Sequence, residues 1–231
     1  MTLAKIAALA FAAALSIGAT TPQTLPGRDW NRAVAVTAAG GHLLGNPAAE
    51  VKLVEFVSYT CPHCSAFEKA GGSALQVGYV ASGKVSVEVR HLVRDPVDLT
   101  VALLTNCGNP SRFFGNHALF LRGQDKWIPR MSLTGPAFQQ RWTTGDFATR
   151  MRAIATDFGF YAMMASRGYD RPTVDRCLAD EGKGRRLAEM TQAAIEAGVK
   201  GTPSFLVDGA LSDAHDWRGL ETELRARLKR S

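Results

Sequence analysis

The chain has 231 residues, of which 46% are hydrophobic and 21% are charged, so it can bury the core of one domain or of one domain with an insertion. Its formal net charge is +6, but the lysines and arginines are interleaved with acids. No aromatic or glycine-rich motif of a nucleic-acid-binding module accompanies them, so we expect no nucleic acid partner.

The N-terminus is typical of an export signal. Lys5 precedes a mainly apolar run over 6–17, and small residues follow it. The run is too short to span a bilayer comfortably, so the sequence predicts a cleaved signal over 1–19 and a tether rich in Pro, Thr and Gly over 20–31. Export to an oxidising compartment would allow the four cysteines to exist as disulfides.

Two strands are predicted next, over 32–37 and 51–59, and the segment 40–47 between them reads as a turn. The second strand has apolar residues on both faces, which is typical of a central strand. Glu55 interrupts one of these faces. An acid on an apolar strand face is costly to ionise, so we expect its pKa to be raised.

Cys61-Pro62-His63-Cys64 follows this strand directly and precedes a helix predicted over 65–82. At a helix start, the unpaired N–H groups and the positive end of the helix dipole favour a thiolate on the first cysteine. Cys61 is therefore the candidate nucleophile. Cys64, one turn further along, is the candidate for closing a disulfide or resolving a mixed disulfide.

Two other interpretations of this motif remain open. Half of a zinc site is one, but zinc sites need a second ligand pair, and Cys107 and Cys177 are each isolated. A purely structural disulfide is the other, although closing so short a loop removes little chain entropy.

A strand over 84–93 completes a strand–helix–strand unit, which predicts that the two strands are parallel. Residues 95–199 show only helix-like periodicity, which indicates an inserted helical region. Helices are expected at about 97–107, 112–123, 135–140, 146–158, 160–167, 173–178 and 183–197. The chain then predicts a hairpin over 204–211, with a turn at Asp208-Gly209, and a last helix over 217–229.

This order of elements predicts an α/β thioredoxin fold over 32–95 and 199–231, with a helical subdomain inserted over 96–198 before the final hairpin. The chain resembles the exported DsbA-like disulfide oxidoreductases. The resemblance lies in Phe56-Val57-Ser58-Tyr59-Thr60-Cys61-Pro62-His63-Cys64, in Glu68 after this motif, and in Val199-Lys200-Gly201-Thr202-Pro203-Ser204-Phe205.

The resemblance implies roles for several residues. Pro203 would be a cis proline that lies against the disulfide, with Thr202 and Pro203 forming an edge on which a substrate peptide pairs. His63 would tune the Cys61 thiolate. Glu55 would be the buried acid that exchanges a proton with Cys64, unless it pairs with Lys52 or a loop cation. Glu68 is expected on a solvated helix surface.

The resemblance also implies a structural disulfide between Cys107 and Cys177, with two buried thiols as the alternative. Thr202 departs from the strongly oxidising members. A threonine before the cis proline is similar to that of isomerases and reductases, which leaves the direction of exchange open.

We therefore expect a monomeric periplasmic thiol:disulfide oxidoreductase that uses Cys61 and Cys64, with no cofactor and no metal beyond this redox-active disulfide. Its partners would be reduced or unfolded exported proteins and, by resemblance, a quinone-linked membrane oxidase. The alternatives are a disulfide isomerase or reductase of the same superfamily, and a non-catalytic factor that binds a peptide or copper through the same sulfurs.

Overall fold

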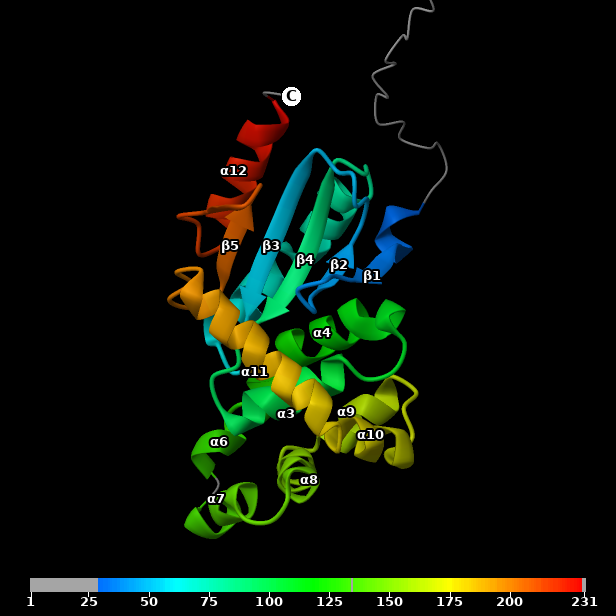
Figure 1. Ribbon diagram of the computed structural model, residues 1–231, viewed down its shortest axis with the longest axis vertical. Helices are drawn as coiled ribbons and strands as arrows, with labels where there is room; N and C mark the ends of the chain where they lie inside the picture. The colour runs from blue at the N-terminus through cyan, green and yellow to red at the C-terminus, as the bar shows by residue number, and fades with distance from the viewer. Residues whose placement is uncertain (1–28, 134, 230–231) are drawn as a thin grey trace, which may run out of the picture.

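The computed structural model describes residues 29–133 and 135–229, so the expected export signal and most of the tether lie outside the described residues. One six-stranded sheet with the order β1-β2-β4-β3-β5-β6 forms the upper half of the molecule (Figure 1). Its strands are β1 (Val34–Val36), β2 (His42–Leu44), β3 (Val51–Val57), β4 (Val85–His91), β5 (Ser204–Val207) and β6 (Ala210–Leu211). β3 and β4 are parallel, as predicted, and the other neighbours are antiparallel.

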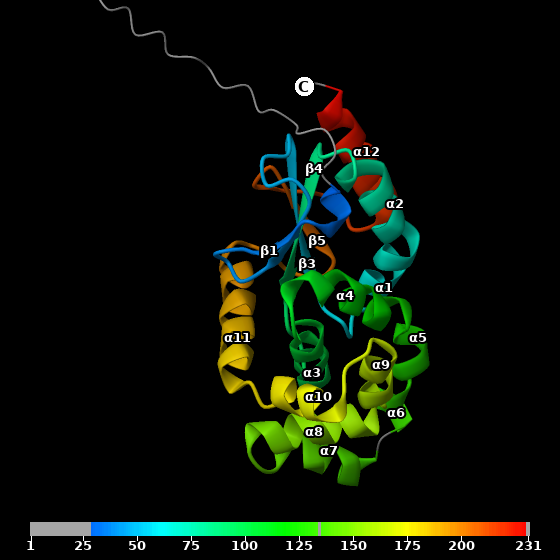
Figure 2. The same ribbon diagram turned by 90° about the vertical axis from the view of Figure 1, so that its right-hand side faces the viewer.

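β3 is central, with β4 on one side and β5 on the other. Alternate residues of β3 face different layers, because side chains of a strand point to opposite faces in turn. Leu53 and Val57 join the main core, whereas Phe56 packs with Ala194 in a smaller cluster. Figure 2 shows the corresponding helices, with α11 (Glu181–Glu196) on one side of the sheet and α12 (Trp217–Leu228) on the other.

The prediction of a turn over 40–47 was wrong in part, because this segment contains β2. β2 has only three residues, and a strand this short shows no clear alternation in sequence. Its pairing with β1 and β4 defines it instead. Gly45 ends it with a φ of +105°, a conformation that favours glycine.

The helical stretch after Cys61 contains two π-helical turns. It runs through α1 (Pro62–Phe67), η2 (Glu68–Gly72), α2 (Ser73–Leu75) and η3 (Gln76–Val80). A Cβ on Gly71 would lie 2.4 Å from the ring of Trp217, so a glycine is needed for α12 to approach this stretch. Trp217 also contacts Phe67 ring to ring, which joins α12 to α1.

Residues 96–198 are helical in the structure and form the lower half of the molecule (Figure 1). The helices there are α3 (Pro96–Thr105), α4 (Phe113–Arg122), α5 (Gln124–Trp127), α6 (Arg130–Leu133), α7 (Pro136–Thr143), α8 (Phe147–Asp157), α9 (Phe160–Ser166), α10 (Arg171–Leu178) and α11, with a 3₁₀ turn at η4 (Pro110–Arg112). Another 3₁₀ turn, η1 (Trp30–Arg32), precedes β1. The sequence did not predict α5 and α6, which have four residues each.

A disulfide joins Cys107, just after α3, to Cys177 in α10, with the two Cα atoms 5.5 Å apart. This is the pair that the resemblance implied. The bridge spans 70 positions of sequence, and in the chain-entropy model closing a loop of that length stabilises the fold by about 4 kcal/mol. It ties the two ends of the helical region together.

Candidate active site

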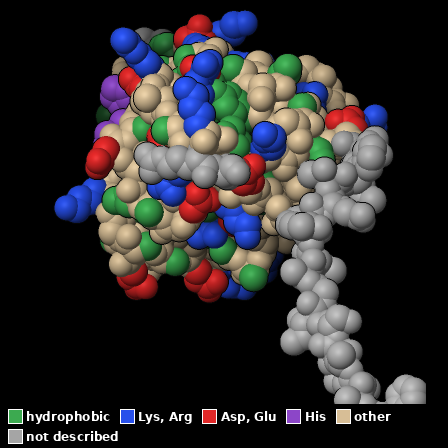
Figure 3. Space-filling model, turned by 90° about the horizontal axis from the view of Figure 1, so that it is seen from above, with side chains coloured by type: hydrophobic (Ala, Val, Ile, Leu, Met, Phe, Trp, Pro, Cys, Tyr) green, Lys and Arg blue, Asp and Glu red, His purple; other side chains and the backbone are tan. Residues whose placement is uncertain are grey.

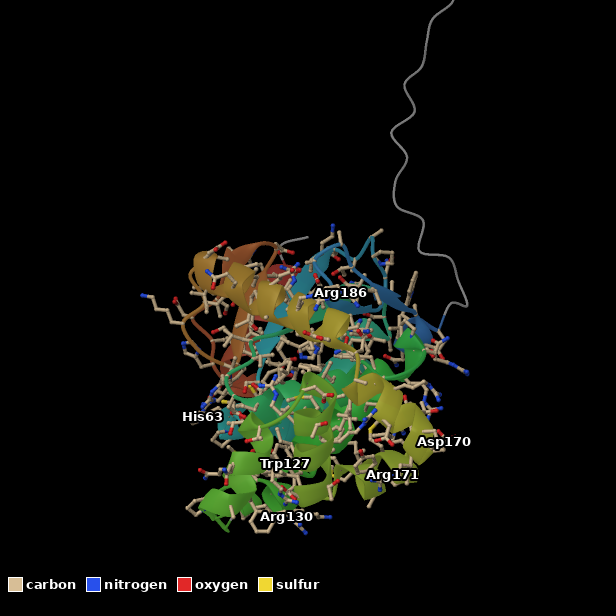
Figure 4. All side chains as sticks on the ribbon, turned by 60° about the horizontal axis from the view of Figure 1, so that its bottom comes forward. His63, Trp127, Arg130, Asp170, Arg171 and Arg186 are labelled. Atoms are coloured by element: carbon tan, nitrogen blue, oxygen red, sulfur yellow. A yellow bond between two sulfur atoms is a disulfide. The ribbon has the colours of Figure 1, made fainter. Side chains whose placement is uncertain are left out.

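The cysteine motif sits at the carboxyl end of β3, where the loop 58–60 leads into α1. Cys61 caps α1 in an extended conformation, and Pro62 takes the first helical position, where a missing N–H is tolerated. Cys64 is fully buried one turn further along, and both sulfurs are free thiols. His63 is exposed and projects from the rim of the molecule (Figure 4).

The second half of the site is the loop before β5. The Thr202–Pro203 peptide bond is cis, and Cys61 Sγ lies 3.0 Å from the Thr202 carbonyl oxygen, to which its thiol form donates a hydrogen bond. Pairing of β5 with β3, with Ser204 opposite Phe56, brings the start of β5 beside the end of β3. The sheet register therefore joins two segments that are 141 positions apart.

The two sulfurs have opposite electrostatic environments. A hydrogen bond from Cys64, together with contributions from Thr202 and from backbone groups, lowers the pKa of Cys61 to about 5 despite partial burial. Burial raises the pKa of Cys64 well above its usual value, and its interaction with Cys61 adds to this. At neutral pH the pair therefore holds a thiolate on Cys61 and a thiol on Cys64.

Glu55 lies in the core face of β3 and is only 3% exposed. Its Oε1 atom has no hydrogen-bond partner among the residues that the structure describes. Burial, and secondly the charge of Glu68, raise the pKa of Glu55 to about 8, and Glu55 in turn raises the pKa of Cys64. Lys52 is exposed and lies on the other face of the strand, so the alternative in which Glu55 pairs with Lys52 finds no support.

The expectation that Glu68 is solvated was wrong, because Glu68 is only 5% exposed. α4 covers this side of η2, and Arg122 at the end of α4 forms an ion pair with Glu68 at 2.7 Å. Burial nevertheless raises the pKa of Glu68, and Arg122 acts in the opposite direction. His117 Nε2 lies 3.9 Å from the other carboxylate oxygen of Glu68.

A groove of about 550 Å³ runs along the cis-proline loop beside the cysteine motif. The residues around it come from α1, the cis-proline loop and the segment after β6, namely His63, Gly198, Lys200, Gly201, Thr202, Pro203, Ser204, Leu211, Ser212, Asp213 and His215. His215 Nδ1 lies 3.4 Å from the Pro203 carbonyl oxygen. A volume of this size exceeds that of a cysteine side chain, so the groove has room for further residues of a bound peptide.

Sequence reasoning did not single out His215, which lies between the hairpin and α12 without a motif of its own. It also did not predict Arg122, whose contact with Glu68 joins positions 54 apart. A polar residue just after the predicted hairpin was the available signal for His215, since the hairpin places that loop beside Pro203.

Comparison with known proteins identifies the family. The sequence model described as Thioredoxin matches residues 37–226, which is most of the chain. The chain belongs to the thioredoxin family. Within the solved members, a protein-disulfide isomerase from Novosphingobium aromaticivorans is 55% identical, with a TM-score of 0.78 and coverage of 82% of this chain and 97% of that one.

Two further thioredoxin-family proteins extend the comparison. The fold matches that of Wolbachia pipientis alpha-DsbA1 with a TM-score of 0.64 at 20% identity, over 82% of this chain and 92% of that one. A curated protein-disulfide oxidoreductase of Rickettsia typhi is 28% identical over 173 residues, which are 74% of this chain and 56% of that protein. The chain thus spans little more than half the length of that relative. The predicted thioredoxin fold of the DsbA-like type is confirmed.

The face of this thioredoxin-family protein that lies above the sheet in Figure 1 carries mixed charge. Figure 3 shows acidic and basic side chains interspersed on the face seen from above. Within residues 29–133 and 135–229, no three His, Cys, Asp or Glu side chains are grouped so as to hold a metal ion. No helix in those same ranges is both long and apolar enough to cross a bilayer.

Proposed function

We propose that the protein exchanges its Cys61–Cys64 disulfide with cysteines of other exported proteins. The observation that carries this proposal is the 3.0 Å contact between Cys61 Sγ and the Thr202 carbonyl, beside the cis bond to Pro203. It joins a reactive sulfur to a backbone edge. A redox sulfur next to an open backbone edge fits a peptide substrate, because an extended chain can pair with such an edge.

The exchange balances in two steps. A substrate thiolate attacks Cys61 Sγ of the oxidised enzyme, the Cys61–Cys64 bond breaks, and the electron pair leaves on Cys64. A second substrate thiolate then attacks the substrate sulfur of the mixed disulfide and Cys61 leaves as a thiolate. The substrate gains a disulfide, and the enzyme gains two electrons. The low pKa of Cys61 makes it a good leaving group in the second step.

Glu55 is the proposed proton donor in the first step. With a pKa of about 8, Glu55 is mostly protonated at neutral pH. It can therefore give its proton to the Cys64 sulfur as the disulfide breaks. Protonated Cys64 has a pKa well above its usual value and would not attack the mixed disulfide again at once.

The groove beside the motif is the proposed peptide site. Thr202 and Pro203 supply the backbone edge, and His63 and His215 stand at its walls. We assign the His63 side chain the role of tuning the Cys61 thiolate from its place beside Cys61 on the groove wall, and the His63 backbone N–H separately lowers the pKa of Cys61. An extended peptide with a free cysteine is the substrate that this arrangement fits.

We also propose a periplasmic location and reoxidation by a quinone-linked membrane oxidase, with a monomeric enzyme. The signal-like pattern over 1–19 supports export. The Cys107–Cys177 disulfide is consistent with an oxidising compartment. These proposals rest on sequence pattern and family likeness.

A reduced model substrate with several cysteines tests the function. We expect the oxidised enzyme to introduce disulfides stoichiometrically and a Cys61→Ser variant to have no such activity. A Lys229→Ala variant, changed at an exposed position after α12, is the matched control and should keep full activity. Full oxidation by the Cys61→Ser variant would overturn the mechanism.

Disulfide isomerisation is the second candidate, favoured by Thr202 and by the isomerase named in the most identical solved structure reported above. A substrate with scrambled disulfides separates the two activities. Recovery of the native pairing without net oxidation supports isomerisation, and net oxidation of reduced substrate supports the first proposal. Stoichiometric copper in protein purified under reducing conditions, without thiol exchange, would favour a copper-binding factor instead.

A further inference from the structure

Asp98, in the first turn of α3, binds the loop 58–60 that carries the cysteine motif. Its Oδ2 atom accepts hydrogen bonds from Ser58 Oγ at 2.6 Å and from the Arg94 N–H at 3.0 Å. Its Oδ1 atom accepts one from the Tyr59 N–H at 2.7 Å. Asp98 thus holds Ser58 and Tyr59, the first two residues of the loop.

Asp95 binds Thr60, the next residue of the loop. Its Oδ2 atom accepts a hydrogen bond from Thr60 Oγ1 at 2.6 Å, while its Oδ1 atom caps α3 through the Asp98 N–H. From the opposite side, Gln124 Nε2 donates to the carbonyls of Tyr59 and Cys61 at 2.6 and 2.9 Å. α3, its N-cap residue Asp95 and Gln124 of α5 therefore hold every residue of the loop 58–60.

The burial of Asp98 is unusual for a residue with no catalytic contact. It is 1% exposed, and no cation pairs with it in the part of the chain that the structure describes. Burial raises the pKa of Asp98 to about 7, even though the hydrogen bonds from Ser58, Tyr59 and Arg94 act to lower it. Hydrogen bonds offset the cost of burying a carboxyl group, so the position of Asp98 depends on its bonds to the loop 58–60 and to the Arg94 N–H.

The loop 58–60 acts on both sulfurs. The Cys61 N–H donates to the Ser58 carbonyl at 3.3 Å, and a backbone hydrogen bond from Ser58 lowers the pKa of Cys64. A shift of Ser58 therefore changes the geometry of the sulfur pair at two points. The hydrogen bond between the two sulfurs, which is the main stabiliser of the Cys61 thiolate, depends on that geometry.

We propose that Asp98 is a positioning residue that sets the reduction potential of the Cys61–Cys64 pair through Ser58 and Tyr59. This inference rests on the proposed function, since it concerns the same redox pair. Asp98 touches no sulfur; it acts by holding the loop in the one conformation that favours the reduced, thiolate form. Looser positioning would stabilise the disulfide relative to the thiolate.

Asp98→Asn tests the proposal with little change of shape. An asparagine has one acceptor oxygen, so it cannot accept from the Tyr59 N–H and the Arg94 N–H together. We expect the ratio of oxidised to reduced enzyme at fixed glutathione to rise about threefold or more, and the pKa of Cys61, followed by thiolate absorbance, to rise with it. Both quantities are measured on the enzyme alone.

Asp170→Asn is the matched control. Asp170 caps α10 through the Thr173 N–H at 2.9 Å and, like Asp98, serves the start of a helix in the inserted region. Figure 4 shows Asp170 on the opposite side of the molecule from His63. We expect this variant to lose stability without any change in the glutathione ratio or in the pKa of Cys61.

Ser58→Ala, alone and combined with Asp98→Asn, tests whether Asp98 acts through Ser58. We expect the double variant to shift the glutathione ratio by less than the product of the two single shifts, because one contact is removed twice. A folded Asp98→Asn enzyme with the wild-type ratio and pKa would overturn the inference, as would fully independent shifts. Neither result contradicts the proposed function. The proposed function would be contradicted by a wild-type protein that does not exchange disulfides.

Discussion

The Cys61 sulfur contacts the carbonyl oxygen of Thr202 at 3.0 Å across 141 positions of sequence. The antiparallel pairing of β3 with β5 produces this contact, because it sets the start of β5 against the strand end that carries the motif. The redox chemistry and the peptide edge thus depend on the same sheet register, which a shift of one residue would destroy.

Glu55 makes the free energy of unfolding fall as the pH rises from 4.5 to about 8. Its pKa is about 8 in the folded protein against 4.5 without burial, so the folded state binds more protons in between and loses stability as pH rises through this window. We expect Glu55→Gln to remove this loss and to raise the free energy of unfolding at pH 9 by on the order of 3 kcal/mol relative to wild type, and hardly at all at pH 4. Urea unfolding of the reduced protein across this range measures it.

The control for Glu55 is Glu50→Gln, an exposed acid just before β3. It should leave the pH profile unchanged. A difference in the free energy of unfolding between wild type and Glu55→Gln that is the same at pH 4 and at pH 9 would show that Glu55 is not the buried neutral acid described here.

Three buried histidines predict acid sensitivity. Burial lowers the pKa of His42 to about 4 and of His117 to about 3, and it lowers the pKa of His91 well below its usual value. Each binds its proton more readily when unfolded, so stability is lost as pH falls below 6.5, by about 2 kcal/mol per histidine at pH 5. Unfolding by urea between pH 7 and 5 checks this.

A substitution can separate the contribution of one histidine to the loss of stability in acid from the contributions of other titrating groups. The His42 ring stacks on Phe113 with ring centres 3.8 Å apart, and its Nδ1 atom has no hydrogen-bond partner within 29–133 and 135–229. His42→Phe keeps the stack and should reduce the acid-dependent loss by about a third. The exposed His63→Gln should leave that loss unchanged, and an equal reduction in both variants would contradict the assignment.

We expect the Cys107–Cys177 disulfide to stabilise the fold and to have no part in thiol:disulfide exchange at Cys61 and Cys64. Replacing both cysteines with serine should lower the free energy of unfolding by about 4 kcal/mol in the chain-entropy model. The glutathione ratio of the Cys61–Cys64 pair should stay the same, because the bridge lies in the helical region away from α1. A changed ratio in a folded variant would indicate that this disulfide is coupled to the site.

His215 is expected to affect peptide binding but not the sulfurs. It lies in the groove, with Nδ1 3.4 Å from the Pro203 carbonyl oxygen. We expect His215→Ala to raise KM for a cysteine peptide by about threefold to tenfold with kcat nearly unchanged, which is the signature of lost uniform binding. His215→Gln should recover part of the loss, and a fall in kcat alone would place His215 in the chemistry instead.

The sequence predicted the parts of the site that local patterns encode. Cys61, Cys64 and Glu55 all follow from one strand and the helix after it, because alternation and helix-start chemistry are local. The burial of Glu68 did not follow, since it depends on Arg122 at the end of a helix 54 positions away. Periodicity carries no information on which distant helix covers a face.

Asp98 illustrates the same limit. Asp95-Pro96-Val97-Asp98 has the pattern of a helix start, and the structure caps α3 through this segment. The pattern explains the contact of Asp95 with the helix. It does not indicate that Asp98 reaches 40 positions back to Ser58, because that contact needs the loop and the insertion to meet.

Trapping of a mixed disulfide tests the central claim most directly. Cys64→Ala enzyme and Cys61→Ala enzyme are each treated with a peptide that carries an activated cysteine disulfide, and the adducts are identified by mass spectrometry. We predict a rapid adduct on Cys61 in the first variant and almost none on Cys64 in the second, because Cys64 is fully buried with a raised pKa. Equally rapid adducts on both sulfurs would contradict the account.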